Sequence, residues 1–261
     1  MRPHDDARSG DALSCDLAYL VAAGKRRFRW AAATAIRCLR GPGGFTGEIR
    51  VFTDRPARMP GGAQCIVVED PVDRAQPKWM KIHAAHSIDF TAYDRVLFLD
   101  SDIVVRAPVA PFLDRCIAAD ALVACDDLCH PIGHGMCARC LSPRELAEHG
   151  ETTPGINSGF WCAPGRHLPG WLAAWERILV ECADRAGPGF DQPGLNAAML
   201  RGAIPVCRVD RQMWFPRRDP DHQRADQDAP IVHFHGIGRH LNRYLRMRRY
   251  ARRLLRAHPP H

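Results

Sequence analysis

The chain has 261 residues, enough for one large domain or two small ones at about 150 residues per domain. Hydrophobic residues make up 46% of it and charged residues 25%, and these ordinary values exclude a disordered or collagen-like chain. No uncharged apolar run reaches the roughly 18 residues of a membrane-spanning helix. The first 12 residues lack the apolar core of a secretory signal, so we expect a soluble, cytoplasmic protein.

The net charge of +7 is carried by the C-terminal segment. Residues 231–261 contain eight arginines and no Asp, Glu or Lys, which leaves a formal charge of −1 for residues 1–230. A body without a basic excess does not favour nucleic-acid binding, and we expect no nucleic-acid partner. The eleven cysteines are an odd number in a chain without a signal peptide. We therefore expect thiols or metal ligands rather than a disulfide framework.

Short apolar runs alternate with helical patterns along the chain. The expected strands are Leu17–Ala23, Glu48–Thr53, Cys65–Glu69, Arg95–Asp100, Ala121–Ala124, Asn157–Ala163, Ile204–Val209 and Ile231–Gly236. The expected helices are Phe28–Leu39, Lys78–Ile88, Trp171–Ala183 and Gln192–Leu200. This alternation predicts an α/β fold with a mostly parallel, Rossmann-like sheet flanked by helices. We expect a flexible N-terminus over residues 1–12, one body over 13–238 and a basic tail over 239–261.

The most informative stretch follows the strand expected at Val96–Leu99. Asp100, Ser101 and Asp102 come directly after its four apolar residues. The carboxyl end of such a strand lies at the sheet edge where α/β proteins bind ligands, and carboxylates two residues apart project to the same side. Two such oxygen donors suit a Mg²⁺- or Mn²⁺-type ion held against a diphosphate. The alternative is a strand that ends in an ordinary turn.

A Cys-rich stretch over residues 125–140 is a candidate zinc knuckle. It contains Cys125, Cys129, Cys137 and Cys140 together with His130 and His134. The spacing of Cys137 and Cys140 is that of structural zinc sites, and the other four residues offer the remaining ligands. The alternative is a loop of reduced thiols with Cys125 buried at a strand end.

Two polar stretches precede expected elements further along the chain. Asn157, Ser158 and Gly159 stand at the start of an apolar strand, where the amide and the hydroxyl could hydrogen-bond a sugar. Asp191 and Gln192 stand at the start of a helix. An ordinary turn explains the first stretch equally, and Asp191 could simply cap its helix.

The last motif is His233-Phe234-His235-Gly236-Ile237-Gly238-Arg239. His233 could complete the ligand set of the Asp pair, while the glycines and Arg239 form an anion site for a diphosphate. As a lone feature, His-x-His is more often structural.

The basic tail is amphipathic at helical spacing. Leu241, Tyr244, Leu245, Met247, Tyr250, Leu254 and Leu255 are set among its arginines. A basic amphipathic helix suits an anionic membrane surface. The alternative is a helix whose apolar stripe docks on the body.

The four ordered motifs resemble those of the GT-A nucleotide-sugar transferases, most closely glycosyltransferase family 8, which includes glycogenin and bacterial lipopolysaccharide galactosyl- and glucosyltransferases. That family has an apolar strand followed by Asp-x-Asp, then Asn-(Ser/Ala)-Gly, Asp-Gln-x-x-Leu-Asn and His-(Phe/Tyr)-x-Gly-x-x-Lys. The resemblance covers residues 15–240, nearly the whole body. Arg239 replaces the usual lysine, and Phe28 stands where a tyrosine is common.

The resemblance implies a GT-A fold and a role for each matching residue. Asp100, Asp102 and His233 would bind Mn²⁺ or Mg²⁺, and Asp191 and Gln192 would be catalytic. The remaining donor-binding residues would be Lys81, Ser101, Asn157, Ser158, Gly236 and Arg239, with Phe28 near the nucleobase.

The activity implied is transfer of a hexose from a nucleotide-diphosphate sugar, most simply a UDP-sugar, to the hydroxyl of a glycan or lipid-linked acceptor, with retention of configuration. Attachment of the tail to the inner membrane face would suit a lipid-linked acceptor. The alternatives are a nucleotide-sugar hydrolase or nucleotidyltransferase, and a zinc-dependent nucleic-acid- or protein-binding module.

Overall fold

The computed structural model of the chain describes residues 15–55, 57–68, 79–135, 137–186, 190–209, 212–215, 228–235 and 240–258. A central sheet of seven strands has the order β3-β2-β1-β4-β7-β6-β8. Its members are β1 (Asp16–Val21), β2 (Glu48–Thr53), β3 (Gln64–Val67), β4 (Arg95–Leu99), β6 (Leu122–Pro131), β7 (Pro154–Pro164) and β8 (Val206–Val209). Strand β7 is antiparallel to both of its neighbours, and the other pairs are parallel. The expected mostly parallel α/β fold is confirmed.

A second, smaller sheet lies beside the first. It has the order β5-β10-β9, with β5 (Ile103–Val105), β10 (Ile231–His233) and β9 (Met213–Trp214). Three residues, Asp100–Asp102, separate the end of β4 from the start of β5. The chain therefore passes from one sheet to the other through the Asp pair.

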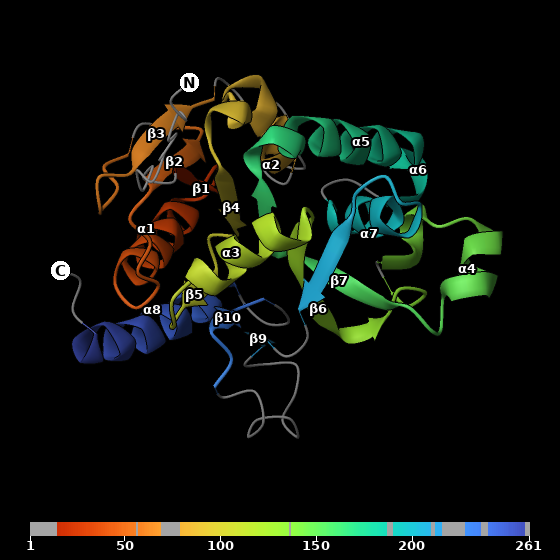
Figure 1. Cartoon of the computed structure of the whole chain (residues 1–261). Coiled ribbons are helices and arrows are strands. Elements are labelled where there is room, and N and C mark those ends of the chain that lie inside the picture. Colours follow the sequence, from red (N-terminus) through yellow and green to blue (C-terminus); the bar gives the residue numbers. More distant parts are fainter. Residues whose placement is uncertain are drawn as a thin grey trace, which may run out of the picture.

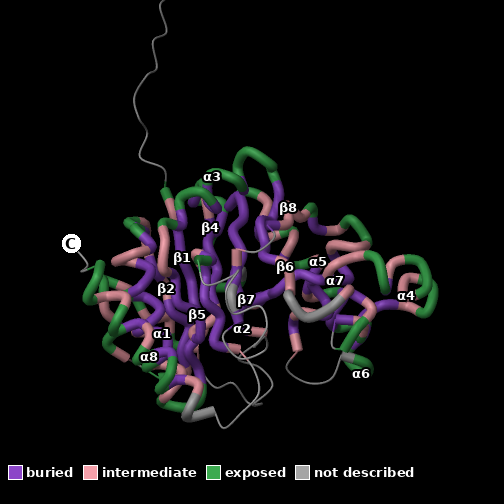
Figure 2. The backbone as a smooth tube through the Cα atoms, turned by 90° about the horizontal axis from the view of Figure 1, so that it is seen from below, coloured by how far each residue is buried: buried purple, intermediate pink, exposed green. Residues whose placement is uncertain are grey.

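Helices cover both faces of the central sheet, which lies between them in Figure 1, and its inner strands β1, β4 and β7 are mostly buried, as Figure 2 shows. Ala18 and Leu20 of β1 pack on one face of the sheet, whereas Leu17 and Tyr19 pack on the other. Successive side chains of a strand point to opposite faces, so both faces must be apolar to be covered. The helices are α1 (Arg26–Arg40), α2 (Met80–His83), α3 (Ala110–Ala119), α4 (Pro143–His149), α5 (Leu168–Glu181), α6 (Ala183–Ala186), α7 (Gln192–Leu200) and α8 (His240–Ala257). Helices α1, α3 and α8 pack on the face of Ala18 and Leu20, and α2, α5 and α7 pack on the face of Leu17 and Tyr19.

The helix expected over Lys78–Ile88 is much shorter in the structure. Helix α2 ends at His83, and a 3₁₀ turn over Ala84–His86 follows it. The hydroxyl of Tyr19 donates a hydrogen bond of 2.8 Å to the Lys81 carbonyl, which satisfies that acceptor from outside the helix. Short 3₁₀ turns also occur at Phe90–Ala92, Cys137–Cys140 and Gly165–His167. Helices α3 and α4 were not among the elements expected from the sequence.

Helix α8 docks on the body through its apolar stripe. Tyr244, Met247 and Ala251 are buried in the same apolar cluster as α1. Figure 1 shows α8 below α1, and the two helices are in contact. Its exposed face carries Arg246, Arg248, Arg249, Arg252, Arg253 and Arg256. The docked arrangement is therefore the one found. In the described part of the chain, no helix has both the length and the apolar character to cross a membrane.

Candidate functional site

The site is built where β4 ends and the two sheets meet. Strand β10 pairs antiparallel with β5, so that His233 lies opposite Ile103. The Phe234 N–H donates to the Asp102 carbonyl at 3.0 Å and extends this pairing by one residue. Backbone hydrogen bonds therefore bring the second aspartate of the pair and a histidine 131 positions later in the sequence into contact.

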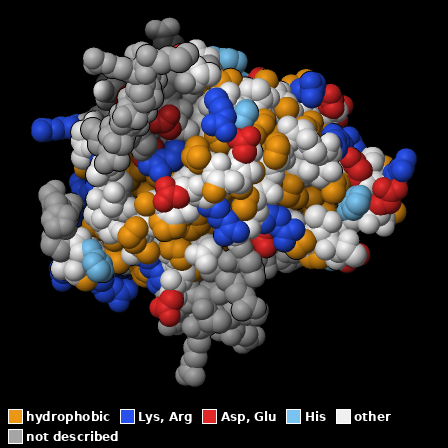
Figure 3. All heavy atoms as spheres, viewed as in Figure 1, with side chains coloured by type: hydrophobic (Ala, Val, Ile, Leu, Met, Phe, Trp, Pro, Cys, Tyr) orange, Lys and Arg blue, Asp and Glu red, His pale blue; other side chains and the backbone are white. Residues whose placement is uncertain are grey.

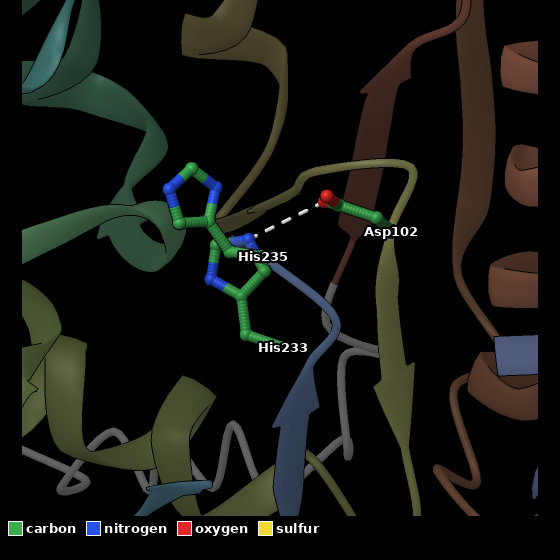
Figure 4. Close-up of side chains that lie close together, drawn as sticks. All are labelled: Asp102, His233 and His235. Carbon is green, nitrogen blue, oxygen red and sulfur yellow. Dashed lines mark ion pairs between the residues drawn. The ribbon is translucent and has the colours of Figure 1, made fainter. Parts of the chain in front are cut away.

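Asp102, His233 and His235 form a group that could hold a metal ion. Their ligand atoms all lie within 4.8 Å of one another. Figure 4 shows the two imidazole rings and the carboxylate together, with the ion pair of Asp102 Oδ1 and His233 Nε2 at 3.3 Å. Burial would raise the pKa of Asp102, but His233 and Arg243 lower it well below its ordinary value. The carboxylate is thus held in its ionised, ligating form.

The residues present fit a divalent cation. Both ring nitrogens of His233 are buried; among the described residues Nδ1 has no hydrogen-bond partner, and Nε2 has only its ion-pair contact with Asp102. Buried polar atoms are normally satisfied, and a metal ion beside Asp102 would satisfy one of them. A donor set of one carboxylate and two imidazoles is compatible with Mn²⁺ and with neighbouring first-row metals. Further ligands would have to come from water or from a bound substrate.

Asp100 lies beside this group and faces a different partner. Its Oδ1 is 3.6 Å from the Lys81 ammonium. Burial raises the pKa of Asp100, although Lys81 acts in the opposite direction. The structure therefore brings together two of the three predicted metal ligands, Asp102 and His233, adds His235, and places Asp100 between the group and a buried lysine.

Lys81 is a buried cation, with a side chain only 3% exposed. Its ammonium lies 2.5 Å from Asp191 Oδ2 and donates to the Ser158 carbonyl at 3.0 Å. Burial alone would lower the pKa of Lys81, but the Asp100 and Asp191 carboxylates raise it above its ordinary value. Lys81 thus stays charged and ties three of the expected site residues together.

Asp191 and Gln192 begin α7. Asp191 holds the N-cap position, yet its side chain makes no capping hydrogen bond and turns to Lys81 instead. Gln192 Nε2 donates to Asp127 Oδ2 at 2.8 Å, and its Oε1 accepts from the Ser158 N–H at 3.3 Å. Both side chains are oriented by partners from outside α7.

Asn157 and Ser158 are buried on β7 beside Gln192. The Asn157 side-chain oxygen accepts from the Gly159 N–H at 2.9 Å, which orients the amide. Asn196 of the Asp-Gln-x-x-Leu-Asn motif has a structural position, because its amide makes hydrogen bonds of 2.8 and 3.0 Å with the backbone of Ile156. It fixes α7 against β7 and does not face the ion group.

For the other predicted site residues, the structure gives little or no information on their roles. Ser101 lies in the turn between the two aspartates and is half-buried. Gly236 and Arg239, expected near a diphosphate, lie outside the described residues. Three further residues were missed: His235, Asp127 and Arg243. Of these, only His235 had a sequence signal, since it stands two residues after His233 in a His-x-His pattern.

The structure removes Cys140 from the candidate zinc knuckle, and the side chains of Cys129 and His130 lie outside the described residues. Cys140 forms a disulfide with Cys182, so it offers no thiolate to a metal. Cys125 is fully buried on β6, and His134 pairs with Glu151 at 3.0 Å. In the part of the chain that is described, the Asp102 group is the only cluster of three or more such ligands. The disulfide also shows that the expectation of only thiols or metal ligands among the cysteines is wrong for Cys140 and Cys182.

Comparison with known proteins identifies the fold. A scan against protein-family models finds no match, and a search of curated protein sequences finds none either. Among solved structures, an active-site mutant of LgtC is similar with a TM-score of 0.60. The alignment covers 90% of this chain and 95% of that one at 14% identity. The chain therefore has a GT-A glycosyltransferase-like fold.

Gly159 is a point at which the cation group can be tested. A Cβ atom at this position would lie 2.8 Å from both Asp100 Oδ2 and His233 Cε1. Gly159→Ala is therefore expected to displace these side chains and to weaken Mn²⁺ binding by about tenfold or more. The measurement is a titration of metal-stripped protein with Mn²⁺, in which the electron paramagnetic resonance signal of the free ion reports how much Mn²⁺ remains unbound.

Gly170→Ala in α5 is the matched control, because a Cβ there meets open space. This variant should bind Mn²⁺ as the unmodified protein does. Equal Mn²⁺ affinity in Gly159→Ala would show that the ion does not bind in this group.

Proposed function

We propose that the protein is a metal-dependent glycosyltransferase that moves a hexose from a nucleotide-diphosphate sugar, a UDP-sugar, to an acceptor hydroxyl with retention of configuration. The observation that carries the proposal is the contact of the Asp102 and His233 side chains at 3.3 Å, at the carboxyl end of β4 in a GT-A-like fold. Ligands of α/β sheets bind at this end of the strands. The polar residues of β7 and α7 stand beside it.

Asp102, His233 and His235 would hold the cation, with Asp100 next to them. Bound Mn²⁺ or Mg²⁺ would supply positive charge to offset the charge that develops on a departing diphosphate. We propose that Gly236 and Arg239 contact the diphosphate and that Ser101 lies close to the nucleotide.

The sugar would lie against Lys81, Asn157, Ser158, Asp191 and Gln192. Asp191 is oriented by its ion pair with Lys81, and it can stabilise positive charge that develops on a sugar ring. Gln192 is held by Asp127 on one side and by Ser158 on the other, so its amide is pre-oriented. We propose that the leaving diphosphate takes the proton of the acceptor hydroxyl, which requires no separate protein base.

The two alternative functions differ in their support. The disulfide at Cys140 removes a ligand from the zinc-dependent binding module, so no structural observation favours it. A nucleotide-sugar hydrolase would use the same cation and donor residues, with water as the acceptor. Transfer and hydrolysis are separated by whether an added acceptor is glycosylated.

The test of function is the metal-dependent release of UDP from UDP-galactose and UDP-glucose, measured with and without acceptor glycans. Asp102→Asn should lower this rate by more than about 100-fold, because a neutral amide is a far poorer cation ligand. Its thermal stability should also fall, because the nearly buried Arg243 loses its charged partner, so the release rate is measured at a temperature at which the variant is folded.

Asp114→Asn is the control, because Asp114 lies on α3 with a side chain 68% exposed. It should retain full activity and stability. Undiminished metal-dependent release by Asp102→Asn would overturn the proposed metal site.

We further propose that α8 holds the enzyme at an anionic membrane surface, on the inner face, near a lipid-linked acceptor. The apolar stripe of α8 is buried in the body, so the contact would be electrostatic, through the exposed arginines of its outer face. Lys and Arg side chains project at the lower left of Figure 3, where α8 lies. Deleting α8 would remove buried core residues, which makes charge substitution the cleaner test.

Replacing Arg246, Arg249 and Arg253 by Gln should therefore weaken the affinity for phosphatidylserine-containing vesicles by about 100-fold, at roughly 1 kcal/mol for each arginine. This affinity is measured by co-sedimentation with the vesicles. Binding of the unmodified protein should fall steeply with salt. A variant with Gln at the exposed Arg115, Arg144 and Arg177 is the control and should bind normally. Unchanged binding of the α8 variant would contradict the proposed surface.

A further inference from the structure

The C-terminal helix reaches the candidate cation site through one side chain. Arg243 Nη1 lies 3.2 Å from Asp102 Oδ2, whereas His233 Nε2 faces the other carboxylate oxygen, Oδ1. The side chains of Arg243 and Asp102 are 13% and 10% exposed. A nearly buried guanidinium, carried by a helix beyond the four sequence motifs, therefore stands at the edge of the ion group.

Neighbouring aromatic residues fix this guanidinium. Its Nη2 donates to the Tyr244 hydroxyl at 2.7 Å, and its central carbon lies 4.8 Å from the centre of the Tyr244 ring. The Tyr244 ring packs edge-on against Phe28, with 5.8 Å between ring centres. Helix α8 thus joins Asp102 to the residue expected near the nucleobase, and it does so through contacts that leave Arg243 little freedom.

The Nε–H of Arg243 remains for a ligand. Its Nε is buried and has no hydrogen-bond partner among the described residues. An unsatisfied buried N–H of a charged group is costly, so a group that accepts from it should be favoured there. Asp102 already pairs with Nη1, and the planar guanidinium fork matches phosphate oxygens in particular.

We propose that Arg243 binds the diphosphate of the nucleotide-sugar donor. This inference rests on the proposed function, because it assigns a residue to the same donor site. Arg243 supplies a positive charge that is fixed to the protein, in addition to the metal ion, and the C-terminal helix becomes part of the donor site. The competing explanation is that Arg243 only neutralises Asp102.

The two explanations predict opposite effects on binding. If Arg243 only neutralised Asp102, its removal would leave more negative charge for Mn²⁺ and would not weaken UDP binding to the metal-loaded protein. If it contacts the diphosphate, its removal weakens UDP binding and spares uridine, which carries no phosphate. Both outcomes are measured on the full chain.

The experiment is calorimetric titration of UDP, and separately of uridine, into protein saturated with Mn²⁺. Arg243→Ala and Arg243→Gln should bind UDP about 10- to 100-fold more weakly, as expected for the loss of charge-assisted hydrogen bonds. Arg243→Lys keeps the charge without the fork, so its loss should be smaller. Arg246→Ala, which removes an exposed arginine of the same helix, should bind UDP normally.

The assignment is overturned if Arg243→Ala and Arg243→Gln bind UDP as tightly as the unmodified protein, or if they lose uridine binding to the same extent. The second result would mean that the packing of α8 has been disturbed. If the unmodified protein binds neither UDP nor GDP with Mn²⁺, the proposed function fails, and the assignment of Arg243 fails with it.

Discussion

The pairing of β5 with β10 is the constraint on which the candidate site depends. Three residues of each strand form an antiparallel ladder that places His233 opposite Ile103, and the Phe234 N–H bonds to the Asp102 carbonyl. These main-chain hydrogen bonds are independent of any ion, so the carboxylate and the imidazole meet in the protein alone. Because these ligands are ordered before an ion binds, the entropic cost of ion binding is lower.

Charge balance explains why so many acidic and basic groups can share this edge of the sheet. Asp100, Asp102 and Asp191 are answered by two buried or nearly buried cations, Lys81 and Arg243. Each cation comes from a helix on a different face of the sheet, α2 or α8, so both helical layers must be in place before the site is complete. An isolated buried carboxylate would instead take up a proton, and it would then be a poor ligand for a cation.

Most residues of the candidate site could be predicted from the sequence, whereas the contacts between them could not. An apolar strand that runs directly into Asp100 and Asp102, and a helix that begins at Gln192, are local patterns that can be read without a fold. The partners of Lys81 and the position of Arg243 depend on how the helices pack, and helix packing cannot be predicted from a local sequence pattern. The Cys140–Cys182 disulfide was missed for the same reason, since nothing near Cys140 in the sequence indicates a partner 42 residues away. The short α2 helix reflects tertiary hydrogen bonding to its backbone, which overrides a helical pattern.

The central claim is that a divalent cation and a nucleoside diphosphate bind together at this edge of the sheet. It is tested most directly by titrating UDP into metal-stripped protein by calorimetry, with and without Mn²⁺, and by repeating the titration with GDP. The account predicts binding that requires Mn²⁺ and favours UDP. Absence of binding by either nucleotide in the presence of Mn²⁺ would contradict it, and Asp100, Asp102 and His233 would then have only structural roles.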